Sequence, residues 1–305
     1  MFKEKFSEGI ISAKQFDRED ILYILKKGKE MIQVKNSTTL HGKILATLFF
    51  EPSTRTRLSF EAAMYRLGGN VIGFQSGEVS SIKKGESLAD TIRTVENYSD
   101  CIVLRHQMEG AAKLAADFAE IPIINAGSGS GEHPTQALLD LLTIREECGT
   151  LDGLNIGIMG DLKYGRTVHS LAILLSNFDV NVYFVSPEEL MMRNRDKELL
   201  QHRQFKFKEI INFRKILDIL DVLYITRIQK ERFIDLEEYE KVKNFYIFKK
   251  DDLKNTKKNF KLLHPLPRIT EISPNVDSSD KAIYFKQTFY GLKLRQAILA
   301  ELLAD

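Results

Sequence analysis

Residues 50–61 read Phe-Glu-Pro-Ser-Thr-Arg-Thr-Arg-Leu-Ser-Phe-Glu, and this segment is expected to join a strand to a helix. The apolar run at residues 44–50 is typical of a buried strand, and apolar side chains recur at helical spacing from Leu58 onward. Residues 53–56 therefore lie where the strand turns into the helix. The backbone N–H groups and the positive dipole end of a helix N-terminus favour an anion at that point.

Residues 53–57 are open to two interpretations. Three hydroxyl groups and two guanidinium groups within five residues suit a phosphate, because hydroxyls donate short hydrogen bonds and arginine offers a planar fork. The alternative is that Ser53 only caps the helix and that the arginines lie on a solvated surface. Arg57 is expected to be an internal ion-pair partner, with Glu51 as the candidate acid. Residues at other strand ends are needed to decide.

The composition excludes several classes of protein. The chain has 305 residues, of which 43% are apolar, which is enough for two domains with cores. Its 44 basic and 42 acidic residues argue against a general nucleic-acid binder. Two cysteines make a disulfide framework or a zinc site unexpected and favour a reducing compartment. No secretory signal and no membrane-length apolar run is found, so we expect a cytoplasmic protein. No metal site is expected.

Short apolar runs alternate with helical patterns along the chain, which is typical of α/β domains with a mainly parallel sheet flanked by helices. A turn at residues 149–153 separates two such series, so two domains are expected. Helices are expected at 17–33, 215–220, 236–242 and 291–303 among others, and strands at 44–50, 71–74, 101–104, 121–124, 155–159, 180–185, 222–226 and 260–263.

Polar side chains collect where these strands end, which is where parallel sheets bind their ligands. They include no carboxylate pair for acid–base work, no serine–histidine–aspartate order and no metal cluster. A cage of cations and hydrogen-bond donors fits chemistry that depends on orientation and on stabilising negative charge. The groups are Ser53, Thr54, Arg55, Thr56, Arg105, His133 and Gln136 in the first half, and Arg166, Arg227, Gln229 and the turn at residues 264–267 in the second.

Two of these segments have simpler interpretations. Residues 160–167 match the spacing of a nucleotide-binding phosphate loop, but Arg166 stands where that loop has its lysine. Arginine does not replace that lysine neutrally, so a nucleotide hydrolase is disfavoured and Arg166 is expected to clamp a carboxylate. His264 precedes a proline and is expected to bond nearby backbone rather than act in catalysis.

Six motifs together resemble a known family, the carbamoyltransferases, over nearly the whole chain. Residues 53–57 resemble its Ser-Thr-Arg-Thr-Arg motif, and residues 133–136 resemble its His-Pro-x-Gln motif. The ornithine-using branch is expected to carry His-Cys-Leu-Pro where this chain has His-Pro-Leu-Pro. The branch that uses aspartate is also matched by residues 83–86, 161–170, 226–232 and 264–268.

The resemblance implies transfer of a carbamoyl group from carbamoyl phosphate to the amine of L-aspartate, an early step of de novo pyrimidine biosynthesis. The implied catalytic residues are those on the carbonyl oxygen, which becomes an oxyanion: Thr56, Arg105 and His133. The carbamoyl amide nitrogen would contact Gln136 and the backbone carbonyls of Leu266 and Pro267. The phosphate would be held by Ser53, Thr54, Arg55, Thr56 and Arg105.

The same resemblance implies how the second substrate is held. The two carboxylates of aspartate would bind Arg166, Arg227 and Gln229. Ser80 and Lys84 would enter the active site of a neighbouring subunit, where Lys84 would also contact aspartate, so a homotrimer is implied. No cofactor and no metal is implied. The protein need not supply a dedicated base, because the departing phosphate can accept the proton of the amine. Regulatory chains are left open as further partners; nucleic acid and membrane are not expected.

The resemblance also implies a domain plan, with the active site in the cleft between the domains and at the subunit interface. Residues 1–134 would bind carbamoyl phosphate, completed by a C-terminal helix at 288–305, and residues 135–287 would bind aspartate. The chain departs from the family pattern at two places. Tyr290 before the last helix leaves the return of that helix in question, and Ser128 stands between two glycines where the family has aspartate. The alternatives are carbamoyl transfer to another amine, such as ornithine, and a non-catalytic subunit that keeps the fold.

Overall fold

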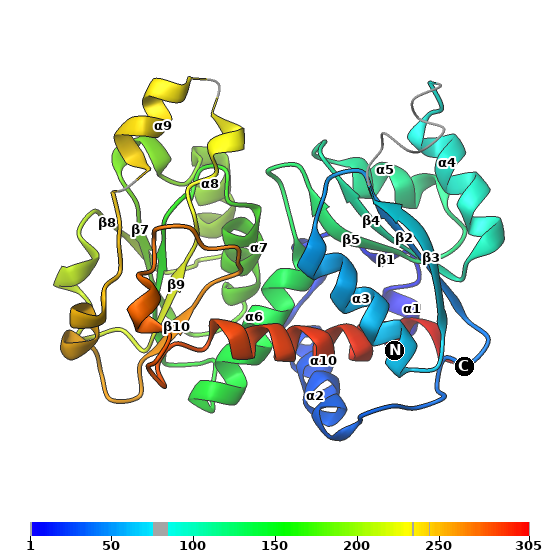
Figure 1. The fold of residues 1–305 in the computed structure, drawn as a ribbon, viewed down its shortest axis with the longest axis horizontal. Coiled ribbons are helices and arrows are strands. Elements are labelled where there is room, and N and C mark those ends of the chain that lie inside the picture. Colours follow the sequence, from blue (N-terminus) through cyan, green and yellow to red (C-terminus); the bar gives the residue numbers. More distant parts are fainter. Residues whose placement is uncertain (1, 76–84, 234, 244, 305) are drawn as a thin grey trace. The chain divides into compact units, whose positions relative to one another are not determined.

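A computed structural model gives the arrangement of the chain (Figure 1). It describes residues 2–75, 85–233, 235–243 and 245–304.

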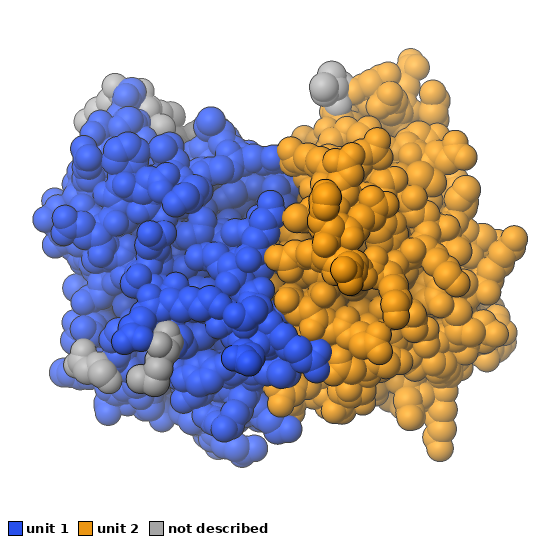
Figure 2. Space-filling view, turned by 180° about the vertical axis from the view of Figure 1, so that it is seen from behind, with its two compact units in different colours: residues 1–142, 289–305 blue, residues 143–288 orange. Residues whose placement is uncertain are grey.

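The chain forms two compact units, shown in different colours in Figure 2. The first comprises residues 1–142 together with 289–305, and the second comprises residues 143–288. The first boundary therefore lies inside a helix, α6 (Pro134–Cys148), whereas the sequence-based division is placed after residue 134. The closing residues belong to the first unit, so the second unit is an insertion within the first.

The first unit contains a five-stranded sheet in which every pair is parallel, in the order β1-β5-β4-β2-β3. The inner strand β2, between β4 and β3, is an almost unbroken apolar run, as expected of a parallel strand that is covered on both faces. The two-residue β1 was too short to be predicted from the sequence. The strands are β1 (Gly9–Ile10), β2 (Ile44–Phe49), β3 (Asn70–Gln75), β4 (Cys101–His106) and β5 (Ile123–Ser128).

Helices cover both faces of this sheet. Ala46 and Leu48 of β2 share a buried cluster with residues of α4 and α5. Thr47 points to the other face, because side chains alternate along a strand, and its hydroxyl approaches Glu61 of α3. The helices are α1 (Phe2–Lys5), α2 (Arg18–Glu30), α3 (Thr54–Arg66), α4 (Leu88–Val95), α5 (Ala111–Phe118), α6 and α10 (Tyr284–Leu303).

The last helix, α10, is part of the core of the first unit. Leu294, Ala297 and Ile298 have no exposed surface. Tyr290, which departs from the family motif, is also buried, and the helix runs through it without a break. The helix begins seven residues earlier than predicted from the sequence.

The second unit repeats the plan with the strand order β10-β9-β6-β7-β8, again all parallel. A buried apolar cluster that includes Phe213, Tyr246 and Phe248 packs against its strands. The fold class predicted from the sequence, two α/β domains with parallel sheets, is therefore confirmed. The elements are β6 (Asn155–Met159), α7 (Arg166–Leu175), β7 (Asn181–Val185), α8 (Asn194–His202), β8 (Phe207–Ile210), β9 (Val222–Ile225), α9 (Leu236–Val242) and β10 (Lys261–Leu263).

One expected helix, at residues 215–220, is wrong. The structure has a short 3₁₀ turn at Phe213–Lys215, started by the side chain of Asn212, which accepts a bond from the N–H of Arg214. Leu217 and Leu220 are fully buried, so the apolar spacing reflects packing in the core and not helical periodicity. Among the described residues, no helix has both the length and the apolar character needed to cross a bilayer.

Candidate active site

Each sheet has a point at which the order of its strands reverses. In the first unit the chain runs from β2 to β3 on one side and then crosses to β4 on the other side of β2. In the second unit it runs from β6 through β7 and β8, and then crosses to β9 on the other side of β6. Ligands of open parallel sheets bind outside the carboxyl ends of the strands at such points. The predicted site residues follow these strands.

The start of α3 lies just beyond the end of β2. Ser53 precedes the helix in an extended conformation, and its side chain makes no capping hydrogen bond. The simple capping interpretation of Ser53 is therefore wrong. Thr54 and Arg55 are exposed, whereas Thr56 is buried with 7% of its surface accessible. The first turn of α3 thus combines a helix N-terminus, which favours an anion such as phosphate, with polar side chains that can add to it.

Arg57 is turned along the helix. Its Nε donates to Oε1 of Glu61 at 2.5 Å, and its second nitrogen donates to Gln75 at 2.9 Å. The suggested partner, Glu51, is wrong: Glu51 instead accepts from Arg105 at 3.4 Å. An i,i+4 pair on one helix face explains the preference for Glu61.

Arg105 is held near the end of β4, beside Phe49 of β2 in the strand register. It is buried, and one guanidinium nitrogen donates to the carbonyl of Ala126 at 3.2 Å while another donates to Glu51. These bonds orient a cation at the reversal point, next to the start of α3.

His133 and Gln136 follow the next strand, β5, which pairs with β4. Both are buried. The carbonyl of His133 accepts from the N–H of Gln136 at 3.1 Å in the first turn of α6. The Nε2 of Gln136 donates to Oδ1 of Asp140 at 2.8 Å. The ends of three adjacent strands, β2, β4 and β5, therefore carry those predicted residues of the first unit that the structure describes.

In the second unit, Arg166 and Arg227 follow the neighbouring strands β6 and β9. Arg166 is the first residue of α7 and is buried. Arg227 forms a two-point ion pair with Glu231, one arm of which measures 3.0 Å. Glu231 raises the pKa of Arg227 above its usual range. Glu231 was not predicted as part of the site.

Asp161 joins the loops that follow β6 and β9. It is fully buried, and its two oxygens accept from the N–H groups of Tyr164 at 2.9 Å and Gln229 at 3.4 Å. The side chain of Gln229 in turn donates to the carbonyl of Tyr164 at 3.2 Å. Burial raises the pKa of Asp161 to about 6, against the opposing effect of these backbone bonds. Asp161 thus fixes the position of the predicted residue Gln229.

The turn after β10 is built around His264, as the structural interpretation of this residue predicted. Its Nδ1 accepts from the N–H of Leu266 at 2.8 Å, so its Nε2 is the donor to Glu271 at 2.7 Å. Burial lowers the pKa of His264, which favours this neutral form. Leu266 has a φ of 56° and precedes a cis peptide bond to Pro267.

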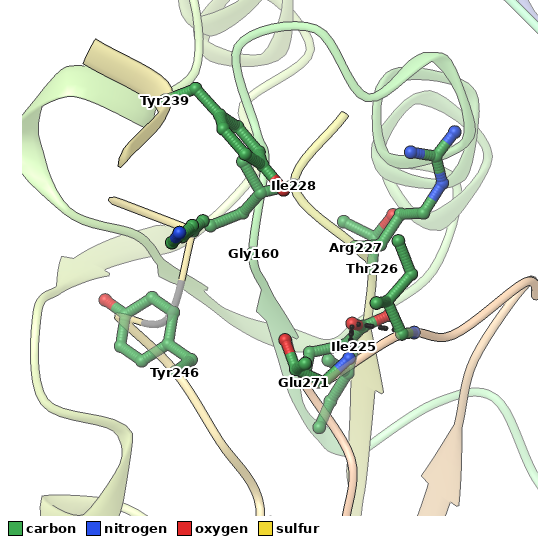
Figure 3. A pocket seen from close by; sticks show the side chains of 11 residues that line it. Gly160, Ile225, Thr226, Arg227, Ile228, Tyr239, Tyr246 and Glu271 are labelled. Atoms are coloured by element: carbon green, nitrogen blue, oxygen red, sulfur yellow. Dashed lines mark hydrogen bonds between the residues drawn. The ribbon is translucent and has the colours of Figure 1, made fainter. Parts of the chain in front are cut away.

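A small cavity of about 20 Å³ lies in the second unit between the loops after β6 and β9 and the segment around Glu271 (Figure 3). That volume holds one water-sized group and not an amino acid. In Figure 3 the side chain of Arg227 extends away from the rings of Tyr239 and Tyr246, which line the other side.

Two predicted residues, Ser80 and Lys84, lie outside the described residues. Within the described part of the chain, no three His, Cys, Asp or Glu side chains are grouped as metal ligands would be.

Comparison with protein families gives the class. Residues 9–146 match the aspartate/ornithine carbamoyltransferase carbamoyl-P binding domain, and residues 152–302 match the Asp/Orn binding domain of the same family. The chain belongs to the aspartate/ornithine carbamoyltransferase family.

Individual relatives narrow the comparison. The aspartate carbamoyltransferase catalytic subunit of Thermococcus gammatolerans is 57% identical over 95% of this chain and 96% of the relative. The aspartate carbamoyltransferase catalytic subunit of Archaeoglobus fulgidus is 52% identical over 96% of this chain and 98% of the relative.

Solved structures of aspartate transcarbamoylases are similar to this chain in fold and in sequence. Aspartate transcarbamoylase of Trypanosoma cruzi, in complex with carbamoyl aspartate and phosphate, has a TM-score of 0.94 at 43% identity, covering 99% of this chain and 98% of that one. The catalytic subunit of Methanocaldococcus jannaschii aspartate transcarbamoylase has a TM-score of 0.89 at 52% identity and covers 97% of each chain.

Proposed function

We propose that this chain is an aspartate carbamoyltransferase, which transfers the carbamoyl group of carbamoyl phosphate to the amine of L-aspartate and releases phosphate. The observation that carries the proposal is the position of Arg105, oriented by Glu51 and Ala126 beside the start of α3. A fixed cation next to a helix N-terminus suits a phosphorylated substrate with a carbonyl that must accept charge. The names of the full-length relatives support aspartate as the acceptor.

In this proposal the first unit holds carbamoyl phosphate. The buried residues Thr56, Arg105 and His133 face the carbonyl oxygen. Gln136 and the carbonyls of Leu266 and Pro267 accept from the carbamoyl amide. The phosphate is held by Ser53, Thr54, Arg55, Thr56 and Arg105, where the hydroxyls and guanidinium groups add to the backbone N–H groups of α3.

The chemical step follows from these contacts. The uncharged amine of aspartate attacks the carbonyl carbon, forming a C–N bond, and negative charge develops on the carbonyl oxygen. Thr56, Arg105 and His133 stabilise that charge with donors that are oriented beforehand. The C–O bond to phosphate then breaks, and the departing phosphate takes the proton of the amine. Carbamoyl aspartate and phosphate are the products.

Aspartate is held by the second unit. Arg166 and Arg227 supply two cations, which match the two carboxylates of aspartate. Ornithine carries only one carboxylate. The bond between Arg227 and Glu231 supports this role, because it demonstrates that the guanidinium accommodates a carboxylate in the two-point geometry. Gln229, oriented by Asp161, adds a neutral contact.

The domain roles and the assembly are also proposals. Residues 1–134 with the closing helix serve carbamoyl phosphate, and residues 135–287 serve aspartate. Three chains form a homotrimer in the cytoplasm, and Ser80 and Lys84 of a neighbouring subunit complete each site. Support comes from Leu58 and Tyr65, two large apolar side chains seven residues apart on α3, which are 57% and 59% exposed. Sedimentation of the purified chain tests this directly, with the mass of three chains expected.

The experiment that tests the function measures phosphate release from carbamoyl phosphate, with L-aspartate and L-ornithine offered separately to the purified chain. Turnover with aspartate and formation of carbamoyl aspartate, which feeds pyrimidine biosynthesis, is expected. Turnover with ornithine alone would overturn the assignment of the second unit. Absence of turnover with either amine, despite binding of carbamoyl phosphate, would favour a non-catalytic subunit.

A further inference from the structure

A buried pair of opposite charges in the first unit has no part in the mechanism above. Asp140 of α6 has no exposed surface, and Arg295 of α10 is 4% exposed. Burial lowers the pKa of Arg295 to about 10, and the nearby Asp140 carboxylate opposes that shift, so the guanidinium is charged at neutral pH. Two buried charges are costly unless each compensates the other. A buried pair of this kind is weak evidence for stability, so its contacts with neighbouring residues are the place to look for another role.

Asp140 touches a residue that the proposed mechanism uses. Its Oδ1 accepts a hydrogen bond of 2.8 Å from Nε2 of Gln136, one helical turn earlier. An ionised carboxylate only accepts hydrogen bonds, so the nitrogen and not the oxygen of the Gln136 amide must face Asp140. The amide oxygen of Gln136 is then the end that accepts from other groups. The orientation of Gln136 is set by its hydrogen bond to Asp140.

Arg295 connects the same pair to the start of α3. It donates to Oγ of Ser59 at 2.5 Å, and Ser59 donates to the backbone carbonyl of Thr56 at 3.1 Å. Its guanidinium also lies over the ring of Phe60, 4.9 Å from the centroid. The cation that balances Asp140 is thus fixed by contacts from α3 as well.

We propose that Asp140 is a positioning residue, which orients Gln136 so that the site selects a carbamoyl group over other acyl groups. The amide nitrogen of carbamoyl phosphate donates hydrogen bonds, and the Gln136 oxygen is the matching acceptor. Acetyl phosphate has the same shape but carries a methyl group in place of that nitrogen. Arg295 places a positive charge close to the Asp140 carboxyl group that holds Gln136. The inference rests on the proposed function and specifies how its substrate is recognised.

The test measures the binding of carbamoyl phosphate and of acetyl phosphate to the unaltered protein and to the Asp140→Asn variant. Asparagine can present its own NH₂ group to Gln136, which lets the amide of Gln136 turn over. We expect the preference for carbamoyl phosphate over acetyl phosphate to fall about tenfold, the scale of one hydrogen bond, with little change for acetyl phosphate. A loss that affects both ligands equally would mean that Asp140 acts only on the structure, and would overturn the proposal.

Further variants make the outcome decisive. Asp140→Glu keeps a carboxyl group that faces Arg295 but shifts it by one methylene. This variant is expected to lose preference for carbamoyl phosphate over acetyl phosphate, and it can be tested even if Asp140→Asn does not fold. Full preference in Asp140→Glu would contradict the proposal. In Gln136→Met, adding Asp140→Asn should cause no further loss of preference. Asp117→Asn, in an exposed pair with Lys113, is the matched control and should keep the full preference.

The two proposals fail in different ways. If the unaltered chain shows no preference for carbamoyl phosphate over acetyl phosphate, the proposed substrate is wrong. If it shows the preference and Asp140→Asn keeps it, only the role of Asp140 is wrong.

Discussion

Arg105 and Thr56 approach the reversal point of the first sheet from neighbouring strands, and both are buried there. In the proposed mechanism, removing either side chain deletes one oriented donor to the developing oxyanion. Arg105→Ala or Thr56→Ala is expected to lower turnover by about 10²–10³. Steady-state phosphate release measures the effect, and unfolding in urea verifies that the variants fold. Unaltered turnover in both variants would exclude the assignment of these residues.

Asp161 gives the protein a pH-dependent stability. Its pKa is raised from 3.8 to about 6 in the folded chain, so between these values the folded state binds more protons than the unfolded state. The contribution of Asp161 to the free energy of unfolding is therefore greatest below pH 4 and declines as the pH rises to about 6, by about 2–3 kcal/mol. In Asp161→Asn this decline disappears. Urea unfolding at pH 4.5 and pH 7 measures the difference between the variant and the unaltered chain.

The matched control for this experiment is Asp179→Asn in the same unit, since the Asp179 side chain is 84% exposed. It should follow the unaltered chain at both pH values. An Asp161→Asn variant with the same pH dependence as the unaltered chain would show that the carboxyl titrates normally.

At the residue level, the sequence predicted the basic residues of the candidate site well and its acidic residues poorly. Arg105 and Arg227 were predictable because a polar residue directly after an apolar run marks the end of a strand. These residues and their neighbours are oriented by acids that look like ordinary acidic residues in the sequence. The acids are Asp161, Asp140 and Glu231. Asp161 contacts Gln229 across 68 positions, and only the pairing of β6 with β9 brings them together.

At the level of elements, the turn after β10 is held by a single carboxylate. Glu271 accepts from His264 and from the backbone N–H groups of Ile269 and Thr270. In Glu271→Gln one accepting oxygen becomes an NH₂ group, so a buried donor loses its partner. We expect a loss of about 1–3 kcal/mol in the free energy of unfolding. The proposed contact of the Leu266 carbonyl with the carbamoyl amide also implies a higher KM for carbamoyl phosphate.

Urea unfolding and initial-rate kinetics measure the two effects of Glu271→Gln. Glu240→Gln, in an exposed ion pair with Lys243, is the control and should change stability by less than about 0.5 kcal/mol. A Glu271→Gln variant as stable as this control would show that the turn does not depend on the carboxylate.

Elements differed in how well the sequence predicted them. Each strand predicted from an apolar run is present with both ends within a few residues of the prediction, because a buried parallel strand has a simple signature. β8 (Phe207–Ile210) was missed, since it is an edge strand with half of its residues exposed. The wrong helix at residues 215–220 shows that a short apolar pattern alone does not distinguish a helix from buried turns.

At the level of the whole molecule, the first unit depends on residues from both ends of the chain. A chain that stops after residue 288 lacks most of α10 and its buried Leu294, Ala297 and Ile298. We expect the second unit of this truncated chain to remain folded and the first unit to lose its structure, with loss of carbamoyl-phosphate binding. Hydrogen exchange should show protection in residues 143–288 only.

A chain that stops after residue 303 keeps the whole of α10 and is the control for this truncation. It should bind carbamoyl phosphate as the full chain does. Protected amides in residues 1–142 of the shorter chain would show that the first unit folds without α10.

The return of the chain to its first unit also sets the order in which a ribosome can complete the two units. Most multidomain chains finish their N-terminal domain first. Here residues 143–288 are all available before the helix that closes the first unit has been made. At about 5–20 residues per second, residues 1–142 wait roughly 8–30 s for the last part of their core. During that interval a nascent chain exposes apolar surface, so its yield in a cell depends on the supply of chaperones as well as on the stability of the finished protein.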